Sequence, residues 1–442
     1  MLPTERRAAL SLALIYMVRM LGLFSVLPVF VLFAGEFKGS TPFLVGLALG
    51  IYGLFQAALQ IPLGLLSDKI GRKKTIAIGL IVLGIGSVVA AMSESIYGVI
   101  VGRALQGAGA IAAALMALAA DLSREEQRTK MMAMLGASIG VSFLLALLLG
   151  PILITFLSVQ MLFWFTAASA VFALVILFTA VPDPEVSGFH ADTTARVASL
   201  GELFRFKKLQ QLNISIFSLH LLITATFVAV PVLLRDAGLD SARHWQVYLP
   251  GVLLSVLAMI IFIYFAERKQ HMRLVLLICI AGLALTQAVF VVLPQSVVWL
   301  FVGLLLFFSF LNTLEALLPS LVSRIAPAGS RGGANGIYSS SQFLGGFVGG
   351  AGGGWLVGQF GFTGLYLVLM SVCLLWFMAL RGFTAPKLLT THRRRLSAEE
   401  LARGDSVVRE LGLLPGVQEV VLSPEEGVAY MKVDKARFKP AS

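Results

Sequence analysis

The sequence contains little charge and few of the side chains that support enzymatic or metal chemistry. Only 13% of its 442 residues are charged, and it has two cysteines and five histidines, whereas a soluble domain typically carries about 25% charge. Cys279 and Cys373 have no partner at the spacing of a metal or redox motif. We therefore expect no enzyme, no cofactor and no metal site, because no nucleophile–base pair or metal cluster occurs at a recognisable spacing.

Long apolar runs dominate the chain instead, and 58% of its residues are hydrophobic. A helix needs about 20 apolar residues to cross a hydrocarbon core of roughly 30 Å. Runs of this length recur almost without pause, and the first is too long for a signal-peptide core and lacks a cleavage site. The expected membrane helices cover 9–33, 44–66, 75–93, 97–120, 131–153, 160–181, 210–234, 245–266, 273–293, 297–322, 333–358 and 362–382.

Basic residues are distributed unevenly between the loops on the two sides of these helices. If the N-terminus is cytoplasmic, the cytoplasmic loops and N-terminal segment hold 18 Lys and Arg, against three in the outer loops. This bias is typical of membrane proteins and predicts a multi-pass protein of a bacterial-type inner (plasma) membrane with both termini inside. The net charge of +11 thus indicates topology and contact with anionic lipid, not nucleic-acid binding.

The chain divides into two similar halves separated by one long polar stretch. The Phe24–Pro28 segment of the first helix is echoed by Phe227–Pro231, 203 positions later, and the loop from Asp68 is echoed weakly from Glu267, 199 positions later. This offset indicates an internal duplication, whose two bundles can rock around a shared site. We predict an N-terminal bundle (1–181), a cytoplasmic linker (182–209), a C-terminal bundle (210–382) and a soluble tail (383–442); a static membrane scaffold is the alternative.

The most specific motif is the loop Gly64-Leu-Leu-Ser-Asp68-Lys-Ile-Gly71-Arg72. It resembles the signature loop of the major facilitator superfamily, whose fold has twelve helices in two pseudo-symmetric six-helix bundles. The resemblance implies that Asp68, Arg72 and Asp121 form a conformational latch that stabilises one transport state, with Gly64 and Gly71 permitting close packing and a tight turn. The alternatives are a simple topological role for the basic residues Lys73 and Lys74 and a helix-cap role for Asp121.

Two further segments are similar to family motifs. Arg103 and Gln106, in Gly102-Arg-Ala-Leu-Gln-Gly107, match a motif whose arginine has been linked to proton coupling. Gly150-Pro151 matches part of the pattern associated with antiporters, although Ile154 and Thr155 stand where its closing glycines are expected. A proline hinge with ordinary helix packing is an equal alternative for Gly150 and Pro151.

Other polar residues lie deep in apolar helices: Arg19, His220, Asn312 and Glu315. The family resemblance places the helices that carry Arg19, Arg103, His220 and Glu315 around one central cavity. Glu315 is the only carboxylate expected well inside the membrane, where desolvation would suit it to carry a proton. Structural hydrogen bonding remains the alternative for Arg19 and His220.

Glycines are frequent in residues 345–354, and we attribute them to close helix packing, not to cofactor binding.

In the tail, Ser397 is a candidate helix cap before a helix that extends to residue 414. Residues 417–422 and 427–433 alternate between apolar and polar side chains like strands. The tail resembles a small cytoplasmic ferredoxin-like α/β module. It has no Cys-x-x-Cys, so metal-chaperone activity is not expected, and the module would lack its last helix.

These features predict a monomeric secondary transporter that uses alternating access. The function we expect first is proton-coupled export of a drug-like or amphipathic solute. A proton symporter or uniporter of a polar nutrient remains open, because the antiporter pattern is degraded. A membrane sensor that signals through its tail without transport is the alternative from another class. We expect the partners to be a small-molecule substrate, protons and the lipid bilayer.

Overall fold

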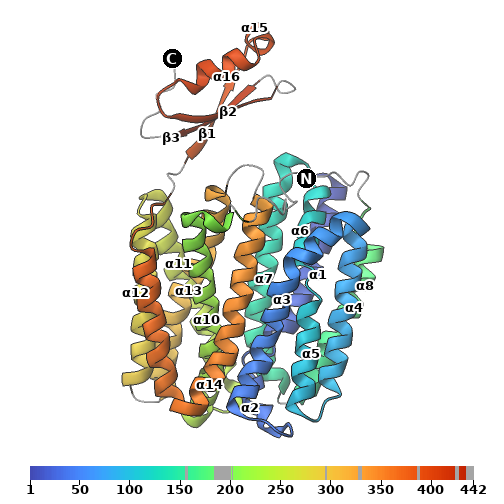
Figure 1. Cartoon of the computed structure of the whole chain (residues 1–442), viewed down its shortest axis with the longest axis vertical. Coiled ribbons are helices and arrows are strands. Elements are labelled where there is room, and N and C mark those ends of the chain that lie inside the picture. The colour runs from blue at the N-terminus through green and yellow to red at the C-terminus, as the bar shows by residue number, and fades with distance from the viewer. Residues whose placement is uncertain are drawn as a thin grey trace. The chain divides into compact units, whose positions relative to one another are not determined.

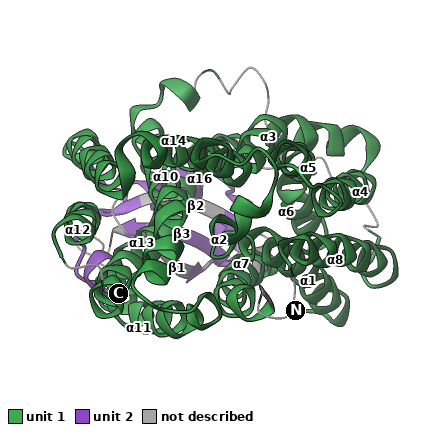
Figure 2. Ribbon diagram, turned by 90° about the horizontal axis from the view of Figure 1, so that it is seen from below, with its two compact units in different colours: residues 1–263, 274–383 green, residues 264–273, 384–442 purple. Residues whose placement is uncertain are grey.

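The computed structural model describes residues 1–154, 158–183, 201, 203–293, 296–326, 331–385, 389–423 and 428–434. They form two compact units, shown in different colours in Figure 2. The first comprises Met1–Ile263 and Leu274–Phe383, and the second comprises Tyr264–Arg273 and the segment from Thr384. Most of the predicted linker, residues 184–200 and 202, lies outside the described residues.

The first unit consists of long helices that run side by side (Figure 1). Its N-terminal half contains α1 (Pro3–Phe24), α2 (Phe30–Phe33), η1 (Ala34–Glu36), α3 (Pro42–Ile70), α4 (Arg72–Ala91), α5 (Ile96–Ala108), α6 (Ala112–Asp121), α7 (Glu125–Ile154) and α8 (Val159–Thr179). Its C-terminal half contains α10 (Lys207–Asp236), η2 (Ser241–Arg243), α11 (Trp245–Ile263), α12 (Met272–Val292), α13 (Val297–Ile325) and α14 (Arg331–Leu380).

Eleven helical segments in the described residues are long and apolar enough to cross a membrane. The last of them, within α14, is unusual because α14 has 50 residues, which would extend about 75 Å as a straight helix. Gly361 has a non-helical backbone (φ 66°, ψ −171°) and separates two helices within α14. This break lies between the predicted spans 333–358 and 362–382.

Two other predicted spans are interrupted, which corrects the expectation of continuous helices. The helix expected over 97–120 is divided into α5 and α6, because Gly109 leaves the helical conformation (φ −73°, ψ 41°). A Cβ at Gly109 would overlap the Gly79 carbonyl oxygen, so the break is packed tightly against α4. The helix expected over 9–33 ends at Phe24, shortly before Pro28, whose ring disfavours a helical residue before it. Pro231, which the predicted duplication pairs with Pro28, lies within an uninterrupted α10.

Glycines bring α14 into close contact with two helices, which confirms the packing predicted for residues 345–354. A Cβ at Gly349 would overlap the Leu221 carbonyl oxygen of α10, and a Cβ at Gly46 of α3 would overlap the Gly350 carbonyl oxygen. The α3–α14 contact joins the two halves of the chain. Backbones can approach this closely only where the side chains are small.

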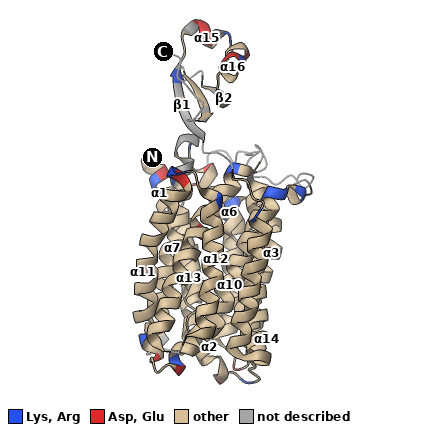
Figure 3. Ribbon diagram, turned by 90° about the vertical axis from the view of Figure 1, so that its left-hand side faces the viewer, with Lys and Arg blue, Asp and Glu red and all other residues tan. Residues whose placement is uncertain are grey.

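Charged residues lie mainly at the two ends of the helices of the first unit, and few lie between (Figure 3). This distribution agrees with helices that have their middle turns in hydrocarbon, where an unpaired charge is costly.

The second unit contains η3, a π-helix (Tyr264–Arg268), and a small α/β segment of β1 (Leu389–Arg395), α15 (Ala398–Ala402), α16 (Asp405–Gly412), β2 (Val417–Ser423) and β3 (Val428–Asp434). The strands form an antiparallel sheet in the order β1-β3-β2, with His392 opposite Met431. Val407, Leu411 and Met431 belong to its core. Ser397 caps α15 as predicted, but Gly404 (φ 46°) divides the expected single helix, and β1 was not foreseen.

Candidate functional site

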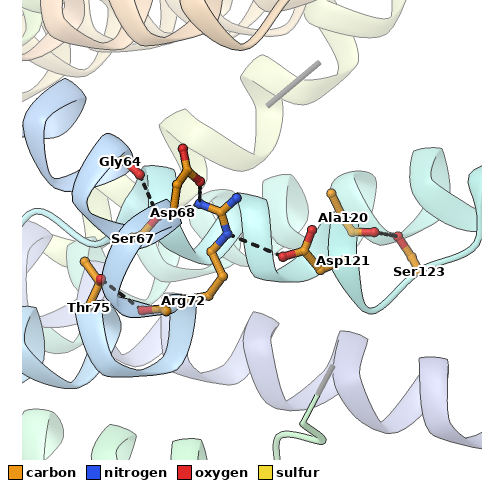
Figure 4. Close-up of polar contacts among 9 residues, drawn as sticks. Gly64, Ser67, Asp68, Arg72, Thr75, Ala120, Asp121 and Ser123 are labelled. Carbon is orange, nitrogen blue, oxygen red and sulfur yellow. Dashed lines mark hydrogen bonds and ion pairs between the residues drawn. The ribbon is translucent and has the colours of Figure 1, made fainter. Parts of the chain in front are cut away.

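The three charged residues of the predicted latch lie together at one end of the N-terminal half (Figure 4). Arg72, at the start of α4, pairs with Asp68 in the last turn of α3 and donates from Nε to Asp121 Oδ2 at 3.4 Å. Its Nη1 also donates to Ser67 Oγ at 2.6 Å. The arginine thus joins the ends of α3, α4 and α6.

The backbone explains why this cluster forms in so short a loop. Gly71 has φ 101°, a conformation that side chains disfavour, and it allows α4 to begin directly after α3. Gly64 leaves room for α6, because a Cβ there would lie 3.1 Å from Ala113 Cβ. The side chain of Asp121 is only 1% exposed, so water screens its attraction to Arg72 little.

Arg103 lies buried inside the N-terminal half, and backbone and amide groups satisfy it. Its Nε donates to the Ala48 carbonyl oxygen at 3.2 Å and its Nη1 to Gln106 Oε1 at 2.9 Å. The guanidinium also stacks over the Tyr52 ring, 5.2 Å from its centroid. Gln106 in turn donates to Ser87 Oγ at 2.8 Å, so both predicted motif residues belong to one hydrogen-bonded network.

Arg19 is similarly buried, with 2% of its surface exposed. Its Nη2 donates to Tyr52 Oη and Gln56 Oε1, both at 2.8 Å, and to the Gly109 carbonyl oxygen at 3.3 Å. The last contact satisfies a carbonyl that the break between α5 and α6 leaves without its helical partner. Within the described part of the chain, neither Arg19 nor Arg103 pairs with a carboxylate.

The C-terminal half holds a different kind of polar cluster, made by His220 of α10, Glu315 of α13 and Gln342 of α14. His220 Nε2 lies 4.0 Å from Glu315 Oε1 and 2.7 Å from Gln342 Nε2. Its Nδ1 lies 3.3 Å from the Ile216 carbonyl oxygen. The carbonyl can only accept, so the geometry fits a neutral ring that donates from Nδ1 and accepts at Nε2 from the Gln342 amide.

Glu315 is more exposed than the sequence led us to expect. Its side chain is 43% exposed and that of His220 is 21% exposed, so the full desolvation assumed for Glu315 is absent here. Asn312, one turn earlier on α13, donates to Ser255 Oγ of α11 at 2.8 Å. Asn312 therefore helps to join two helices of the C-terminal half.

The four predicted cavity residues form two separate sets of polar contacts in the described structure. Arg19 and Arg103 are packed among the helices of the N-terminal half, whereas His220 and Glu315 pair in the C-terminal half. The family-based expectation that all four face one central cavity stays a prediction.

Gly150 and Pro151 lie in the last turns of α7, which stays helical through the proline. A Cβ at Gly150 would lie 3.1 Å from the Ser25 carbonyl oxygen and 3.2 Å from Pro28 Cγ. Gly150 thus packs against the interrupted end of α1. Thr155, which departs from the antiporter pattern, lies outside the described residues.

A chain of aromatic rings links the two halves. Phe24 of α1 lies 5.4 Å from Phe143 of α7, which lies 6.4 Å from Phe308 of α13, and Phe308 lies 6.5 Å from Phe227 of α10, all measured between ring centroids. These distances suit aromatic packing. Together with the α3–α14 contact, they hold the halves against each other.

Sequence reasoning missed Tyr52, Gln56 and Gln342 as members of these clusters. A glutamine inside an apolar span is a usable signal, because its amide must find a partner there. It does not identify that partner, which for Gln342 lies 122 positions away.

Comparisons with known proteins agree with this architecture. The Major Facilitator Superfamily model matches residues 12–349 and 264–424. The chain is 42% identical to the inner membrane transport protein YajR of Escherichia coli (strain K12) over 98% of its own length and 95% of that protein. The relatives are transporters, which confirms that the chain is not an enzyme.

Two solved transporters share the fold at low identity. The human organic anion transporter MFSD10 superposes with a TM-score of 0.60 at 20% identity, covering 86% of this chain and all of that one. A D-xylose–proton symporter gives 0.66 at 16% identity, covering 86% and 97%. The family match and the near full-length likeness to YajR lead to one conclusion: the chain belongs to the major facilitator superfamily of membrane transporters.

Proposed function

We propose that the chain exports a small amphipathic solute by proton-coupled alternating access, with His220 and Glu315 as the proton site. The observation that carries the proposal is their 4.0 Å pairing, since Glu315 is the only carboxylate of a candidate membrane span that lies away from the helix ends. Glu315 is ten residues before the end of α13, about 15 Å along the helix.

The hydrogen bonds suggest how a proton would change this cluster. A neutral His220 with its proton on Nδ1 would accept from the Gln342 amide at Nε2, which fits the 2.7 Å between the two nitrogen atoms. A proton at Nε2 removes that acceptor and creates a cation beside Glu315, so the ring exchanges its bond to α14 for attraction to α13. Proton binding would therefore alter the contact between α14 and its neighbours.

The latch and the aromatic chain supply two features that alternating access needs. In this proposal, Asp68, Arg72 and Asp121 stabilise one conformation at the latch end, and Gly64 and Gly71 permit their approach. The row of aromatic rings from Phe24 to Phe227 keeps the two halves in contact away from the latch. Gly150 and Pro151 form a hinge beside these rings. Rocking of one half against the other would break one set of contacts while forming the other.

The same proposal includes twelve membrane crossings, both termini in the cytoplasm, a monomer, and the domain limits predicted above. The break at Gly361 supports the twelfth crossing, because it turns one overlong segment into two of membrane length. The antiparallel β1-β3-β2 sheet supports a ferredoxin-like tail.

Dye transport into inside-out vesicles tests the proton site. With ethidium as the probe, we expect accumulation that collapses when an uncoupler removes the pH gradient, and Glu315→Gln should reduce it at least tenfold, since an amide cannot carry a proton. Glu94→Gln, outside the spans, is the matched control and should transport normally.

The other functions give different results in the same vesicles. If the Glu315→Gln variant transports ethidium with undiminished dependence on the pH gradient, the assignment of Glu315 to the proton site is wrong. Accumulation of a polar nutrient in right-side-out vesicles would indicate a symporter, flux indifferent to the pH gradient would indicate a uniporter, and saturable binding without any flux would indicate a sensor.

A further inference from the structure

A cavity of about 620 Å³ lies between the beginning of α1 and the end of α8. Arg6, Arg7, Leu10, Leu14 and Ile176 are among the residues that line it. Lys73 Nζ donates to the Val181 carbonyl oxygen at 2.7 Å, so the end of α8 adjoins the start of α4. The cavity is therefore at the same end of the helices as the latch.

The mouth of this cavity carries positive charge that the protein leaves uncompensated. Arg7 Nη2 donates to the Thr179 carbonyl oxygen at 2.8 Å, which fixes its guanidinium across the gap between the two helices. In the described structure, the side chain of Arg6 has no hydrogen-bond or ion-pair partner, and its backbone N–H donates to the Leu2 carbonyl oxygen at 2.9 Å. The nearby carboxylate of Glu5 is already occupied by Arg124 Nε at 3.0 Å and by the Leu2 N–H at 2.6 Å.

The rest of the cavity is apolar and faces the surroundings of the helices. Leu10 is 53% exposed, and Leu14 and Ile176 follow it along the same groove. The one hydroxyl there, that of Ser11, donates to the Arg7 carbonyl oxygen at 2.8 Å and is thus used within its own helix. A matching ligand needs an anionic group next to a hydrocarbon chain.

We propose that this cavity binds one anionic phospholipid, with the phosphate between Arg6 and Arg7 and an acyl chain along Leu10 and Leu14. Basic pockets between membrane helices at the cytoplasmic face suit such headgroups. A soluble phosphate compound would satisfy the arginines but would leave the apolar groove exposed. The lipid would join α1 to α8 at the end that carries the latch.

Native mass spectrometry of the full chain, purified in detergent, tests this site with phosphatidylglycerol and phosphatidylcholine of identical acyl chains. We expect preferential retention of phosphatidylglycerol. Arg6→Gln should weaken it about fivefold, and the double variant with Arg7→Gln more strongly, because each basic residue near an anionic surface contributes about this factor. Arg6→Gln removes no side-chain hydrogen bond or ion pair of the described structure, so it separates lipid binding from folding.

A charge-matched control exists at the start of α10. Lys207→Gln with Lys208→Gln removes two positive charges from the first turn of another helix and should leave retention unchanged. Equal retention of both lipids, or equal effects of the two double variants, would overturn the proposal. Competition by sn-glycerol 3-phosphate at the affinity of the lipid would overturn it in favour of a soluble phosphate ligand, whereas weaker binding in Leu10→Ser would support the acyl-chain contact.

Discussion

The two halves of the chain handle charge inside the membrane in opposite ways. The N-terminal half buries Arg19 and Arg103 among carbonyl and amide oxygens, whereas the C-terminal half holds His220 and Glu315 as a partly exposed pair. A guanidinium does not lose its proton in proteins, but imidazole and carboxylate groups exchange theirs. The N-terminal half therefore holds enclosed guanidinium groups, and the C-terminal half holds an imidazole beside a carboxylate.

Burial explains what each kind of charge can contribute. Arg103 is enclosed among acceptors for its guanidinium group, so removing it leaves a buried acceptor unsatisfied. Arg19 differs, because its Nε and Nη1 are buried without a hydrogen-bond partner. The side chains of His220 and Glu315 are partly exposed, so replacing one of them should disturb the packing of the helices less. We therefore expect substitutions in the first half to change stability and those at the His220–Glu315 pair to change transport.

The largest expected effect on stability follows replacement of Arg103. Arg103→Leu leaves the buried Gln106 amide oxygen without its donor, at a cost of about 1–3 kcal/mol for an unsatisfied group, and it also removes the bond to the Ala48 carbonyl oxygen. Thermal unfolding in detergent should show a clear loss, whereas Glu315→Gln should lie within about 0.5 kcal/mol of the native protein. Equal losses of stability in the two variants would contradict the view that buried charge in the N-terminal half, unlike the His220–Glu315 pair, supports the fold.

A smaller effect is expected at the latch, on the balance between conformations. Asp121→Asn preserves the shape of the side chain but weakens its bond to Arg72, and charged hydrogen bonds contribute about 1.5–3 kcal/mol. We expect a shift of roughly tenfold in the population of the latched state, measured by distances between spin labels on the two halves. Proton coupling through Glu315 should survive.

The control for this prediction is an ion pair at the same end whose carboxylate is exposed. Lys73 Nζ lies 2.7 Å from Asp183 Oδ1, and the Asp183 side chain is 87% exposed. Asp183→Asn should therefore leave the populations unchanged. A shift as large as that in Asp121→Asn would mean that general charge at this end, not the buried latch, sets the balance.

The smallest effect is expected at the Lys38–Glu94 pair, whose charged atoms lie 2.6 Å apart on fully solvated side chains. The hydrogen bond lowers the pKa of Glu94 and raises the pKa of Lys38. Its stabilisation should decline as the pH falls through the lowered pKa of Glu94, or rises through the raised pKa of Lys38. Glu94→Gln should change the unfolding temperature slightly, and less in high salt; a loss comparable to that in Arg103→Leu would contradict this ranking.

Much of the latch was predictable from sequence because its parts are local. Arg72 follows Asp68 by four residues, and Gly71 between them supplies the turn. The family resemblance then added Asp121, whose pairing with Arg72 the structure shows; its effect on transport remains a prediction.

The interior charges were harder to place because their partners are distant in sequence and include backbone atoms. Arg19 bonds to the Gly109 carbonyl, which needs a donor because the helix breaks there. The break itself depends on packing of Gly109 against Gly79. Neither hydropathy nor motif spacing contains that information, so the span 97–120 was expected to be continuous.

Composition and hydropathy were enough to predict a membrane protein and the places where its positive charge accumulates, since both depend on the residues along the chain. Which polar side chains meet depends on the tertiary structure. It separated the two arginines from His220 and Glu315 and joined His220 to Gln342, because hydrogen-bond partners in an apolar interior are fixed by how helices pack. The same packing created the cavity between α1 and α8 that Arg6 and Arg7 line. These two helices lie at opposite ends of the N-terminal half of the sequence.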